Sequence, residues 1–392
     1  MPAPGVPDGA DIAWYAADLQ ARGVRRIHVL AWRDLDDLDA GGSEVHADEF
    51  MQRWATHGLE VLHRTSAAAG LPASDTRNGY RVVRRGSRYS VFARTIASEL
   101  TGRMGPYDAL VEIWNGVPWM SPGWCHKPRI TILHHVHGPM WGQILPGPLA
   151  GFGRVLEARL APPFYRRGVT VTPSEATRQE LIELGFKPQR VHAFPNGVDD
   201  FFSPGGTKTS DPSLIAVGRL APVKRFELVI DATVAARRGV PNLTLTIVGE
   251  GPLRSALEQQ IAAAAAGGYI TLTGKIDRHA LVDHYRRAWL VVSGSLAEGW
   301  GLSLTEAAAC GTPAVATDIR GHRSSVVDGV TGVLVEPERL GAAIADVVAD
   351  DGRRRRLTEA AQARAATLTW DASALGVTQC LHAAVVAKQR RP

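Results

Sequence analysis

The chain has 392 residues, of which 45% are hydrophobic and 21% are charged. These proportions are typical of globular proteins, exclude a chain that is disordered as a whole, and at this length predict two domains. The net charge of +5 permits anionic partners, but no nucleic-acid-binding motif accompanies it, so we expect no nucleic-acid partner.

The cysteines and the first residues indicate where the protein works. Cys125, Cys310 and Cys380 lie far apart in the chain and favour reduced thiols over a disulfide framework or a zinc site. The first residues lack a basic region followed by an apolar core, so we expect no signal peptide. No run of about 18 apolar residues predicts a transmembrane helix. The expected location is the cytoplasm, with the inner face of the membrane as an alternative.

Strand and helix patterns alternate through the first half of the chain. Helices are expected over 45–57 and at the end of 169–184. The predicted strands open or fill the segments 26–32, 59–65, 107–114, 129–135, 169–184 and 191–199. A basic run over 77–94 is either a solvated strand and loop or a surface that attracts phosphate groups or an anionic membrane.

The second half begins the same alternation again. Its predicted strands lie within the segments 213–220, 243–252, 269–274, 288–295, 312–318 and 331–337, with helices after the first two. Strands that are apolar throughout and alternate with helices indicate parallel sheets covered on both faces. The residues 199–213, rich in Gly, Pro, Ser and Thr, separate the two halves. We therefore expect two doubly wound α/β domains, which bind ligands beyond the carboxyl ends of their strands.

The stretch AEGWGLSLTEAAACGTP (297–313) follows a predicted strand directly and holds two carboxylates, Glu298 and Glu306. Its glycines allow sharp turns, and a helix is expected from about Ser303, whose first amides would favour an anion. Glu306 could instead close a capping box with Ser303. Glu298 could be a solvated loop residue. The two glutamates together, in this setting, are a more specific signal of function than either glutamate alone.

EGWGLSLTE resembles the Glu-x7-Glu motif of retaining glycosyltransferases with the GT-B fold, and of glycosyltransferase family 4 in particular. The resemblance continues along almost the whole chain, through AGGSE (40–44), FPNGVD (194–199), VGRLAPVKRFELVI (217–230), VGEGP (248–252), EAAACGTPAVATD (306–318), DGVTGVLVEP (328–337) and LTWDASA (368–374). One departure is Arg225, where the family usually has glycine, and it is expected to be a local surface change.

This resemblance implies two Rossmann-like domains. Residues 1–200, completed by a C-terminal helix over 372–392, would bind the acceptor, and residues 201–371 would bind the nucleotide-sugar donor. It implies a hexosyltransferase that moves a hexose from a nucleotide-diphosphate sugar to a hydroxyl of a glycan or a lipid-linked acceptor, with retention of the anomeric configuration. The alternatives are a GT-B nucleotide-sugar epimerase and a non-catalytic protein that binds nucleotide sugars.

The resemblance also assigns roles to particular residues. Arg219 and Lys224 would contact the donor diphosphate, where fixed cations stabilise the departing phosphate. Glu298 would lie near the donor sugar and Glu306 would bind the ribose hydroxyls. One histidine after the strand 129–133 would face the 6-hydroxyl of the sugar, and this is His134, with the adjacent His135 as the alternative.

Further donor contacts are expected from backbone groups and glycines. The amides of Leu304 and Thr305 would meet the phosphates at the start of a helix. The remaining expected contacts come from Gly41, Gly42, Gly218, Gly249, Gly251, Lys275 and Ile276. None of these glycines forms a dinucleotide-binding fingerprint, so no nicotinamide cofactor is expected.

No cofactor and no required metal are expected, because two cations and a helix start would serve the diphosphate. The acidic stretch DLDD (34–37) is interpreted as a solvated loop, although Asp-x-Asp binds metal in a different glycosyltransferase fold. The histidines of HHVHG (134–138) lack a further ligand cluster in the sequence.

The sequence says less about the acceptor than about the donor. Trp114, Trp119, Trp124 and Trp141 could stack on sugar rings or fill the core. The segment 145–167 mixes apolar residues with arginines and could lie on a membrane or form a buried helix. Peripheral membrane association is therefore one of the expected properties, beside binding of a nucleotide sugar.

Overall fold

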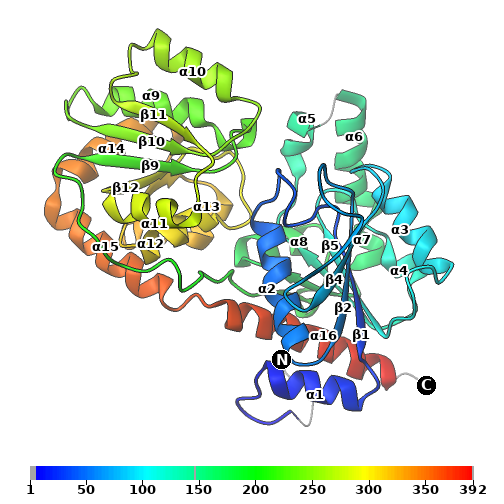
Figure 1. Cartoon of the computed structure of the whole chain (residues 1–392). Helices are drawn as coiled ribbons and strands as arrows, with labels where there is room; N and C mark the ends of the chain where they lie inside the picture. Colours follow the sequence, from blue (N-terminus) through cyan, green and yellow to red (C-terminus); the bar gives the residue numbers. More distant parts are fainter. Residues whose placement is uncertain (1–5, 145–146, 391–392) are drawn as a thin grey trace. The chain divides into compact units, whose positions relative to one another are not determined.

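The structure is a computed structural model that describes residues 6–144 and 147–390 (Figure 1). The chain folds into two compact units. The first unit contains the residues up to Asn196 and those from Trp370 onward, and the second unit is Gly197–Thr369.

The first unit is built on an eight-stranded sheet in the order β3-β4-β2-β1-β5-β6-β7-β8. All neighbouring strands are parallel except β3 and β4. The strands are β1 (Arg26–Leu30), β2 (Glu60–Thr65), β3 (Ser74–Arg77), β4 (Tyr80–Arg84), β5 (Ala109–Trp114), β6 (Arg129–Leu133), β7 (Val169–Thr172) and β8 (Val191–Ala193).

The central strands of this sheet are mainly apolar because both faces are covered, although β5 also holds the buried Glu112. In β5, Val111 and Ile113 belong to the main hydrophobic core, whereas Leu110 packs in a smaller cluster and Trp114 in another. Alternate residues of a strand point to opposite faces, so a strand covered on both sides has no face toward solvent.

Ten helical segments accompany this sheet in the described part of the unit. They are α1 (Ile12–Ala21), α2 (Gly42–Thr56), α3 (Val91–Leu100), α4 (Ser121–Trp124), α5 (Trp141–Ile144), α6 (Gly147–Val155), a π-helical turn (Leu156–Leu160), α7 (Pro162–Tyr165), α8 (Glu175–Glu183) and α16 (Trp370–Gln389). Short 3₁₀ turns lie at Gly138–Met140 and Pro188–Arg190.

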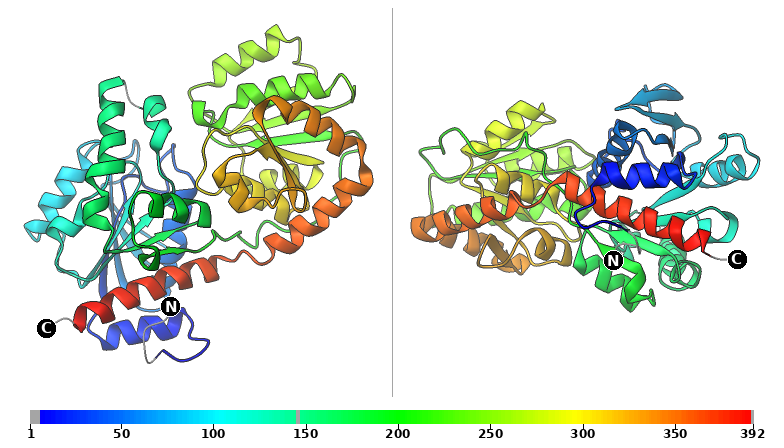
Figure 2. Two further views of the ribbon diagram at one scale, coloured as in Figure 1. Left: turned by 180° about the vertical axis from the view of Figure 1, so that it is seen from behind. Right: turned by 90° about the horizontal axis from the view of Figure 1, so that it is seen from below.

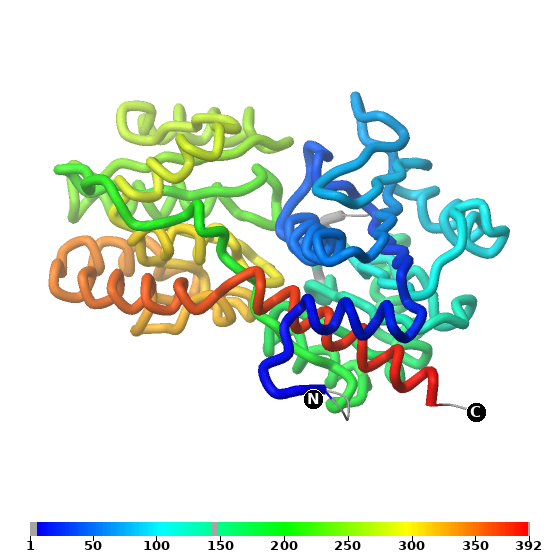
Figure 3. The backbone as a smooth tube through the Cα atoms, turned by 60° about the horizontal axis from the view of Figure 1, so that its bottom comes forward, coloured from blue at the N-terminus to red at the C-terminus, as the bar shows by residue number. Residues whose placement is uncertain are grey.

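The last helix, α16, packs on the N-terminal part of the chain. It runs beside α1, as Figures 2 and 3 show, and it also contacts α2, β6 and β7. Thr378 accepts a hydrogen bond from the Trp54 indole at 2.7 Å. A Cβ atom at Gly376 would lie 2.3 Å from the Phe194 ring, so glycine permits the close contact there.

The second unit holds a six-stranded sheet in the order β11-β10-β9-β12-β13-β14, and every neighbouring pair in it is parallel. Its strands are β9 (Ser213–Val217), β10 (Thr244–Val248), β11 (Ile270–Gly274), β12 (Leu290–Ser293), β13 (Ala314–Thr317) and β14 (Gly332–Val335). Its helices are α9 (Phe226–Ala236), α10 (Arg254–Ala263), α11 (Arg278–Arg287), α12 (Leu302–Ala309), α13 (Arg320–Ser325), α14 (Leu340–Ala349) and α15 (Asp351–Ala365), with 3₁₀ turns at Pro222–Lys224 and Pro337–Arg339.

Two separate cores lie on the two faces of this second sheet. Leu290 and Val292 of β12 face the core that includes residues of α9 and α14, and Val291 faces the core that includes residues of α11 and α12. Figure 1 shows helices on both sides of the strands. The predicted class, two parallel-sheet α/β units, is confirmed.

One part of the fold was not predicted. The basic run over 77–94 contains most of the antiparallel β3–β4 hairpin at the edge of the first sheet and the first four residues of the helix α3. Among the described residues, no helix combines the length and the hydropathy that crossing a membrane requires.

Candidate active site

Three neighbouring loops of the second unit meet at the carboxyl edge of its sheet. They follow β9, β10 and β11 and carry half of the predicted donor contacts. The Gly218 amide donates to the Val248 carbonyl at 3.0 Å, and the Gly249 amide donates to the Gly274 carbonyl at 3.0 Å. The structure thus brings the loops with Gly218, Gly249 and Lys275 together where a doubly wound sheet binds its ligands.

Glycine is required in the loop after β10 because backbone meets backbone there. A Cβ atom at Gly249 would lie 1.9 Å from the Gly218 carbonyl oxygen, and one at Gly251 would lie 2.5 Å from the Leu220 carbonyl oxygen. Both glycines therefore have a packing role, whether or not they also contact a donor.

The same edge holds an ion pair between two predicted site residues. Lys224 ends the 3₁₀ turn Pro222–Lys224 after β9, and Glu298 lies in the loop after β12. The Lys224 Nζ lies 2.5 Å from the Glu298 Oε1, with 26% and 15% of their side chains exposed. The Leu296 amide donates to the Val223 carbonyl at 2.8 Å and joins the two loops. The pair is thus held by backbone as well as by charge.

Glu298 lies in a crowded polar environment. The Ser295 hydroxyl donates to its Oε1 at 2.8 Å. Burial alone would raise the pKa of Glu298, but the nearby charges of Lys224 and His322 outweigh burial and lower the pKa. A Cβ atom at Gly321 would lie 2.2 Å from the Glu298 carbonyl oxygen, so glycine lets α13 approach this loop. The carboxylate is therefore ionised near neutral pH.

The structure explains why the family that this sequence resembles usually has glycine at the position of Arg225. Arg225 has φ of 49° and ψ of 48° at the N-cap of α9, which is the left-handed region. A non-glycine residue costs about 1 kcal/mol or more in that conformation. The expectation of a mere surface change is therefore incomplete, because this position is a conformational one.

The interpretation of Glu306 as half of a capping box is wrong. Helix α12 begins at Leu302, and its N-cap is Gly301 with φ of 95°. Glycine takes this left-handed conformation readily and starts the helix earlier than expected, so Ser303 lies inside the helix. Glu306 is then too far along the chain to reach the N-cap amide.

Glu306 instead accepts a hydrogen bond from the Tyr285 hydroxyl at 3.1 Å. Burial raises the pKa of Glu306 to about 7, although the Tyr285 hydrogen bond and the charge of Arg278 act in the opposite direction. Its charge therefore changes close to neutral pH. The assignment of Glu306 to ribose hydroxyls stays a prediction.

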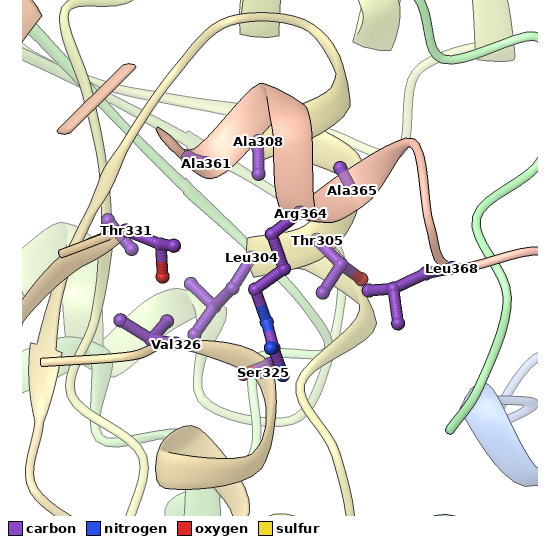
Figure 4. Close-up of a pocket in the computed structure, with 11 residues that line it drawn as sticks. Leu304, Thr305, Ala308, Ser325, Val326, Thr331, Ala361, Arg364, Ala365 and Leu368 are labelled. Atoms are coloured by element: carbon purple, nitrogen blue, oxygen red, sulfur yellow. The ribbon is translucent and has the colours of Figure 1, made fainter. Parts of the chain in front are cut away.

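The side chains of Leu304 and Thr305 point toward α15. They line a small cavity of about 10 Å³ with Ala361, Arg364 and Ala365 of α15 (Figure 4). Such a volume holds about one water molecule. The Leu304 amide donates to the Gly301 carbonyl at 3.0 Å. Donor contacts from these residues, which stay predicted, would have to come from their backbone.

In the first unit, His134 follows β6 and lies buried against His46 of α2. The His46 Nδ1 and the His134 Nε2 are 3.0 Å apart. Burial lowers the pKa of His134 well below its usual value, and it lowers the pKa of His46 to about 4. Both rings are neutral at pH 7, with one nitrogen as donor and the other as acceptor.

The other two histidines of this loop stack on each other. The ring centroids of His135 and His137 are 4.4 Å apart, and His137 lies 5.2 Å from the Trp141 ring. Glu157, from the π-helical turn, accepts the backbone amides of His137 and Gly138 at 2.8 Å each. It also accepts the Trp141 indole at 3.1 Å. A buried carboxylate therefore holds the loop after β6.

Gly41 and Gly42 lie where α2 begins. Gly41 is its N-cap, and its amide donates to the Glu44 carboxylate at 2.8 Å. The Asn115 side-chain amide, after β5, donates to the Ser43 hydroxyl at 2.9 Å. This glycine loop and His134 thus lie at the same carboxyl edge of the first sheet.

The acidic stretch 34–37 is not a solvated loop throughout. Asp34 is fully buried and bonded to Arg84 and, at 2.8 Å, to Arg77 Nη1. Asp36 also pairs with both arginines. Burial would raise the pKa of Asp34, but the two arginine hydrogen bonds lower it. Two arginines of the basic run are therefore partners of the acidic stretch, and in the described ranges no group of His, Cys, Asp and Glu side chains is arranged for a metal ion.

The tryptophans of the first unit mainly fill its core. Trp114, Trp119 and Trp141 are buried, and their indole groups donate within the unit, to Gly116, Ile113 and Glu157. The alternative that these three rings stack on an acceptor sugar is wrong, because their faces are covered by protein.

Family models of known proteins match both units of the chain. The family model "Glycosyltransferase Family 4" matches residues 40–200, and the model "Glycosyl transferases group 1" matches residues 198–364. The chain belongs to the GT-B glycosyltransferases of family 4. It is an enzyme that transfers glycosyl groups.

Individual relatives agree with this assignment. The enzyme is 28% identical to the D-inositol 3-phosphate glycosyltransferase of Xylanimonas cellulosilytica, over 90% of this chain and 94% of the relative. The sucrose-phosphate synthase of Thermosynechococcus elongatus shares the fold with a TM-score of 0.77 and 21% identity, over 91% of this chain and 98% of that one. Anabaena HepE aligns with a TM-score of 0.68 and 18% identity, over 93% of this chain and 99% of that one.

Several residues of the candidate site were not found from the sequence. Tyr285, Gly321 and His322 surround the two glutamates, and Glu157 and His46 surround the histidine loop. Each acts through a contact between distant segments, which leaves no local pattern. Gly321, three residues after the predicted strand segment 312–318, was the one available signal.

Proposed function

We propose that the enzyme transfers a hexose from a nucleotide-diphosphate sugar to an acceptor hydroxyl, with retention of configuration and without a metal ion. The acceptor expected from the sequence is a glycan or a lipid-linked glycan. The observation that carries this proposal is the Lys224–Glu298 pair of 2.5 Å at the carboxyl edge of the second sheet.

The pair supplies a fixed cation for a leaving diphosphate. When the glycosidic bond to the donor breaks, negative charge grows on the departing phosphate oxygen. A cation already in place stabilises this charge more in the transition state than in the ground state, and so accelerates the reaction. Glu298 holds Lys224 in position before the donor arrives, and Arg219 in the same loop adds a second positive charge.

A nucleotide sugar suits the glycine-lined loops of the second unit. Anabaena HepE, which shares the fold, has been solved in complex with UDP-glucose. In this chain the loops after β9 and β10 pack backbone against backbone, which leaves amides and carbonyls rather than side chains to face a nucleotide. Backbone recognition explains why the base is not readable from the sequence.

Independence from metal ions is supported by where the acidic residues are used. Asp34 and Asp36 of the acidic stretch are paired with Arg77 and Arg84. Lys224 and Arg219 provide at the diphosphate the charge that a divalent ion provides elsewhere. Retention follows if the leaving phosphate accepts the proton of the attacking hydroxyl on the same face of the sugar.

A second acceptor class, a phosphorylated polyol, is favoured by a specific observation. Arg64, at the end of β2, is almost fully buried and donates to the carbonyls of Val83 and Arg85, while its Nε lacks a partner among the described residues. Burial, followed by the charges of Arg85 and Arg94, lowers the pKa of Arg64 to about 10, although the charge of Glu99 acts in the opposite direction. Crowded positive charge of this kind favours an anion. Relatives named D-inositol 3-phosphate glycosyltransferases agree with such an acceptor.

The test is a donor and acceptor panel with the full chain. Uridine, guanosine and adenosine diphosphate sugars are offered with glycan, lipid-linked and phosphorylated polyol acceptors, with and without EDTA. We expect nucleotide release with at least one donor, unaffected by EDTA, and a product with the anomeric configuration of the donor by NMR. A product of inverted configuration, or loss of activity with EDTA, would contradict the proposal. Interconversion of the donor sugar without transfer would support an epimerase instead.

A further inference from the structure

A surface of apolar side chains lies on the segment that follows the histidine loop. Leu149 and Phe152 of α6, Leu160 at the end of the π-helical turn, and Phe164 of α7 are between 48% and 58% exposed, and Val155 is 43% exposed. We call these five residues the 149–164 surface. Five of the eleven large hydrophobic side chains exposed in the described part of the chain thus fall within 16 consecutive residues. Such concentrations mark interaction sites on soluble proteins.

The exposure is not a consequence of loose packing. The opposite side of the same segment is buried through Ala150, Gly153, Glu157, Ala161 and Tyr165, which recur every three or four residues. A Cβ atom at Gly153 would lie 2.5 Å from the Trp141 ring, so this side of α6 is tightly packed. The segment therefore has an ordered inner side and an apolar outer side.

The charges on the outer side are all positive. Arg154, Arg159, Arg166 and Arg167 are exposed. Glu157 is the one acidic residue of 147–167, and its carboxylate is buried on the amides of His137 and Gly138. Exposed arginines beside exposed aromatic and aliphatic side chains complement a surface that is anionic above and apolar beneath.

We propose that the 149–164 surface docks on an anionic lipid bilayer, with its apolar side chains at the level of the acyl chains and its arginines at the lipid phosphates. A second copy of this chain is a poorer occupant, because a two-fold contact would place each cluster of four arginines against the same cluster of its partner. Since no described helix can span a bilayer, the contact is peripheral.

This inference is independent of the transfer reaction. Binding to lipid would hold for a water-soluble acceptor as well as for a lipid-linked one. Because Glu157 joins this segment to the loop with His134 and His137, docking would bring that loop of the first unit close to the membrane. A lipid-linked acceptor held in the membrane would then lie close to this loop.

Flotation of the full chain with vesicles tests the proposal. One vesicle is pure phosphatidylcholine, and the other contains about one third phosphatidylglycerol, since each arginine near an anionic surface strengthens binding about fivefold. We expect flotation with the anionic vesicle and its decline as salt is added. R154E/R159E should weaken binding at least tenfold, because each of the two arginines contributes about fivefold. L149S/F152S/F164S should abolish binding.

Matched variants control for net charge and for general hydropathy. R355E/R356E reverses two exposed arginines of α15, and L100S/V330S removes two exposed apolar side chains elsewhere. Both should float like the unaltered chain. Because all substituted side chains are exposed, unchanged thermal unfolding is expected for every variant.

Two results would overturn the proposal. The first is absence of flotation with anionic vesicles at low salt, or an equal loss in the control variants. The second is a dimer in sedimentation velocity that L149S/F152S/F164S disperses while vesicle binding is absent, because the surface would then be covered by a second copy. Nucleotide release measured without vesicles is read separately, so failure of docking and failure of the transfer reaction are distinguishable.

Discussion

The Nζ of Lys224 lies 2.5 Å from the Oε1 of Glu298, although 74 residues separate the two in the chain. The contact exists because the loops after β9 and β12 leave adjacent parallel strands at the same edge. Without a donor, the carboxylate neutralises the lysine. A bound diphosphate would compete for the same ammonium group. Glu298 therefore positions Lys224 before the donor binds, and the diphosphate would then replace Glu298 as the partner of the ammonium group.

Replacement of Lys224 by alanine should lower turnover by about a hundredfold to a thousandfold, the usual cost of removing one group that stabilises transition-state charge. The measurement is nucleotide release under saturating donor. Lys187→Ala, at an exposed lysine of the first unit, is the control and should leave the rate unchanged. Equal rates for the two variants would refute the role of Lys224 at the phosphates.

The titration of Glu306 should appear in the pH dependence of stability. Its folded pKa is raised to about 7, above the ordinary value of 4.5. Between these values the unfolded chain releases the proton while the folded chain keeps it, so stability falls as pH rises from about 4.5 to 7 and then levels off. The loss is at most about 3 kcal/mol.

Glu306→Gln should remove this pH dependence, because an amide does not titrate. Melting temperatures of both proteins at pH 5 and pH 8 provide the measurement. The difference between the two pH values should be smaller in the variant. If it is the same in both proteins, Glu306 is ionised throughout and burial does not govern its titration.

The three histidines after β6 should differ when each is replaced by alanine. His134 contacts His46 inside the unit, so its loss creates a buried vacancy and should reduce stability together with activity. His137 lies with its Nδ1 3.6 Å from the Glu157 carboxylate, which orients the ring, so its loss should lower turnover. His135 is only partly buried, and its replacement tests the remaining assignment. Turnover and melting temperature are measured for all three.

A result in which only His135→Ala loses activity would make His135 the group at the donor sugar. If only His134→Ala loses activity, and by more than its lower melting temperature accounts for, the first assignment holds. The sequence alone could not separate the two, because they are adjacent and the end of β6 decides which ring turns inward. In the structure that strand ends at Leu133, and His134 is the buried one.

The fold was predictable because its signals are local. Each of the six strands of the second unit is a short run of mainly apolar and β-branched residues, such as Leu290–Ser293, followed by a turn or a helix pattern. The glycines after β9 and β10 could likewise be read from the chain, whereas helix α2, predicted from about Val45, begins three residues earlier at Gly42. Periodicity and turn residues act over a few positions, which is the range that sequence patterns record.

The polar interior was not predictable in the same way. Asp34 and Arg84 are 50 residues apart and, taken separately, resemble solvated charges. Their pairing follows from the register of the β3–β4 hairpin, which depends on tertiary contacts. The same applies to Glu157, whose role depends on amides 20 residues earlier in the chain. Long-range pairs of charges and hydrogen bonds leave no spacing rule in one sequence.

Glu157→Gln tests whether the buried carboxylate organises the histidine loop. The amide oxygen of glutamine can still accept from one backbone amide, but its NH₂ group would face another donor, and a buried donor without a partner costs about 1–3 kcal/mol. We expect a lower melting temperature and a lower turnover, with little change in donor KM, because Arg219 and Lys224, the proposed partners of the donor diphosphate, lie in the second unit. Steady-state kinetics and thermal unfolding provide the two readouts.

Glu183→Gln, an exposed change on α8, is the matched control and should behave like the unaltered enzyme. If Glu157→Gln loses stability but keeps full turnover, the carboxylate is structural and does not position the loop for catalysis.

Asp34→Asn separates the two interpretations of the acidic stretch. In the structure Asp34 neutralises the buried Arg84, so the substitution leaves a buried guanidinium with less compensation and should destabilise the enzyme by about 3–5 kcal/mol. A metal-binding role would instead leave stability intact and make activity depend on added divalent ions. Because the pKa of Asp34 is lowered, its stabilising effect should be present above the ordinary pKa of aspartate and lost as pH falls through the folded pKa. Urea unfolding of both proteins, with and without EDTA, measures each effect, and a variant as stable as the parent would contradict the assignment of Asp34 as the partner of Arg84.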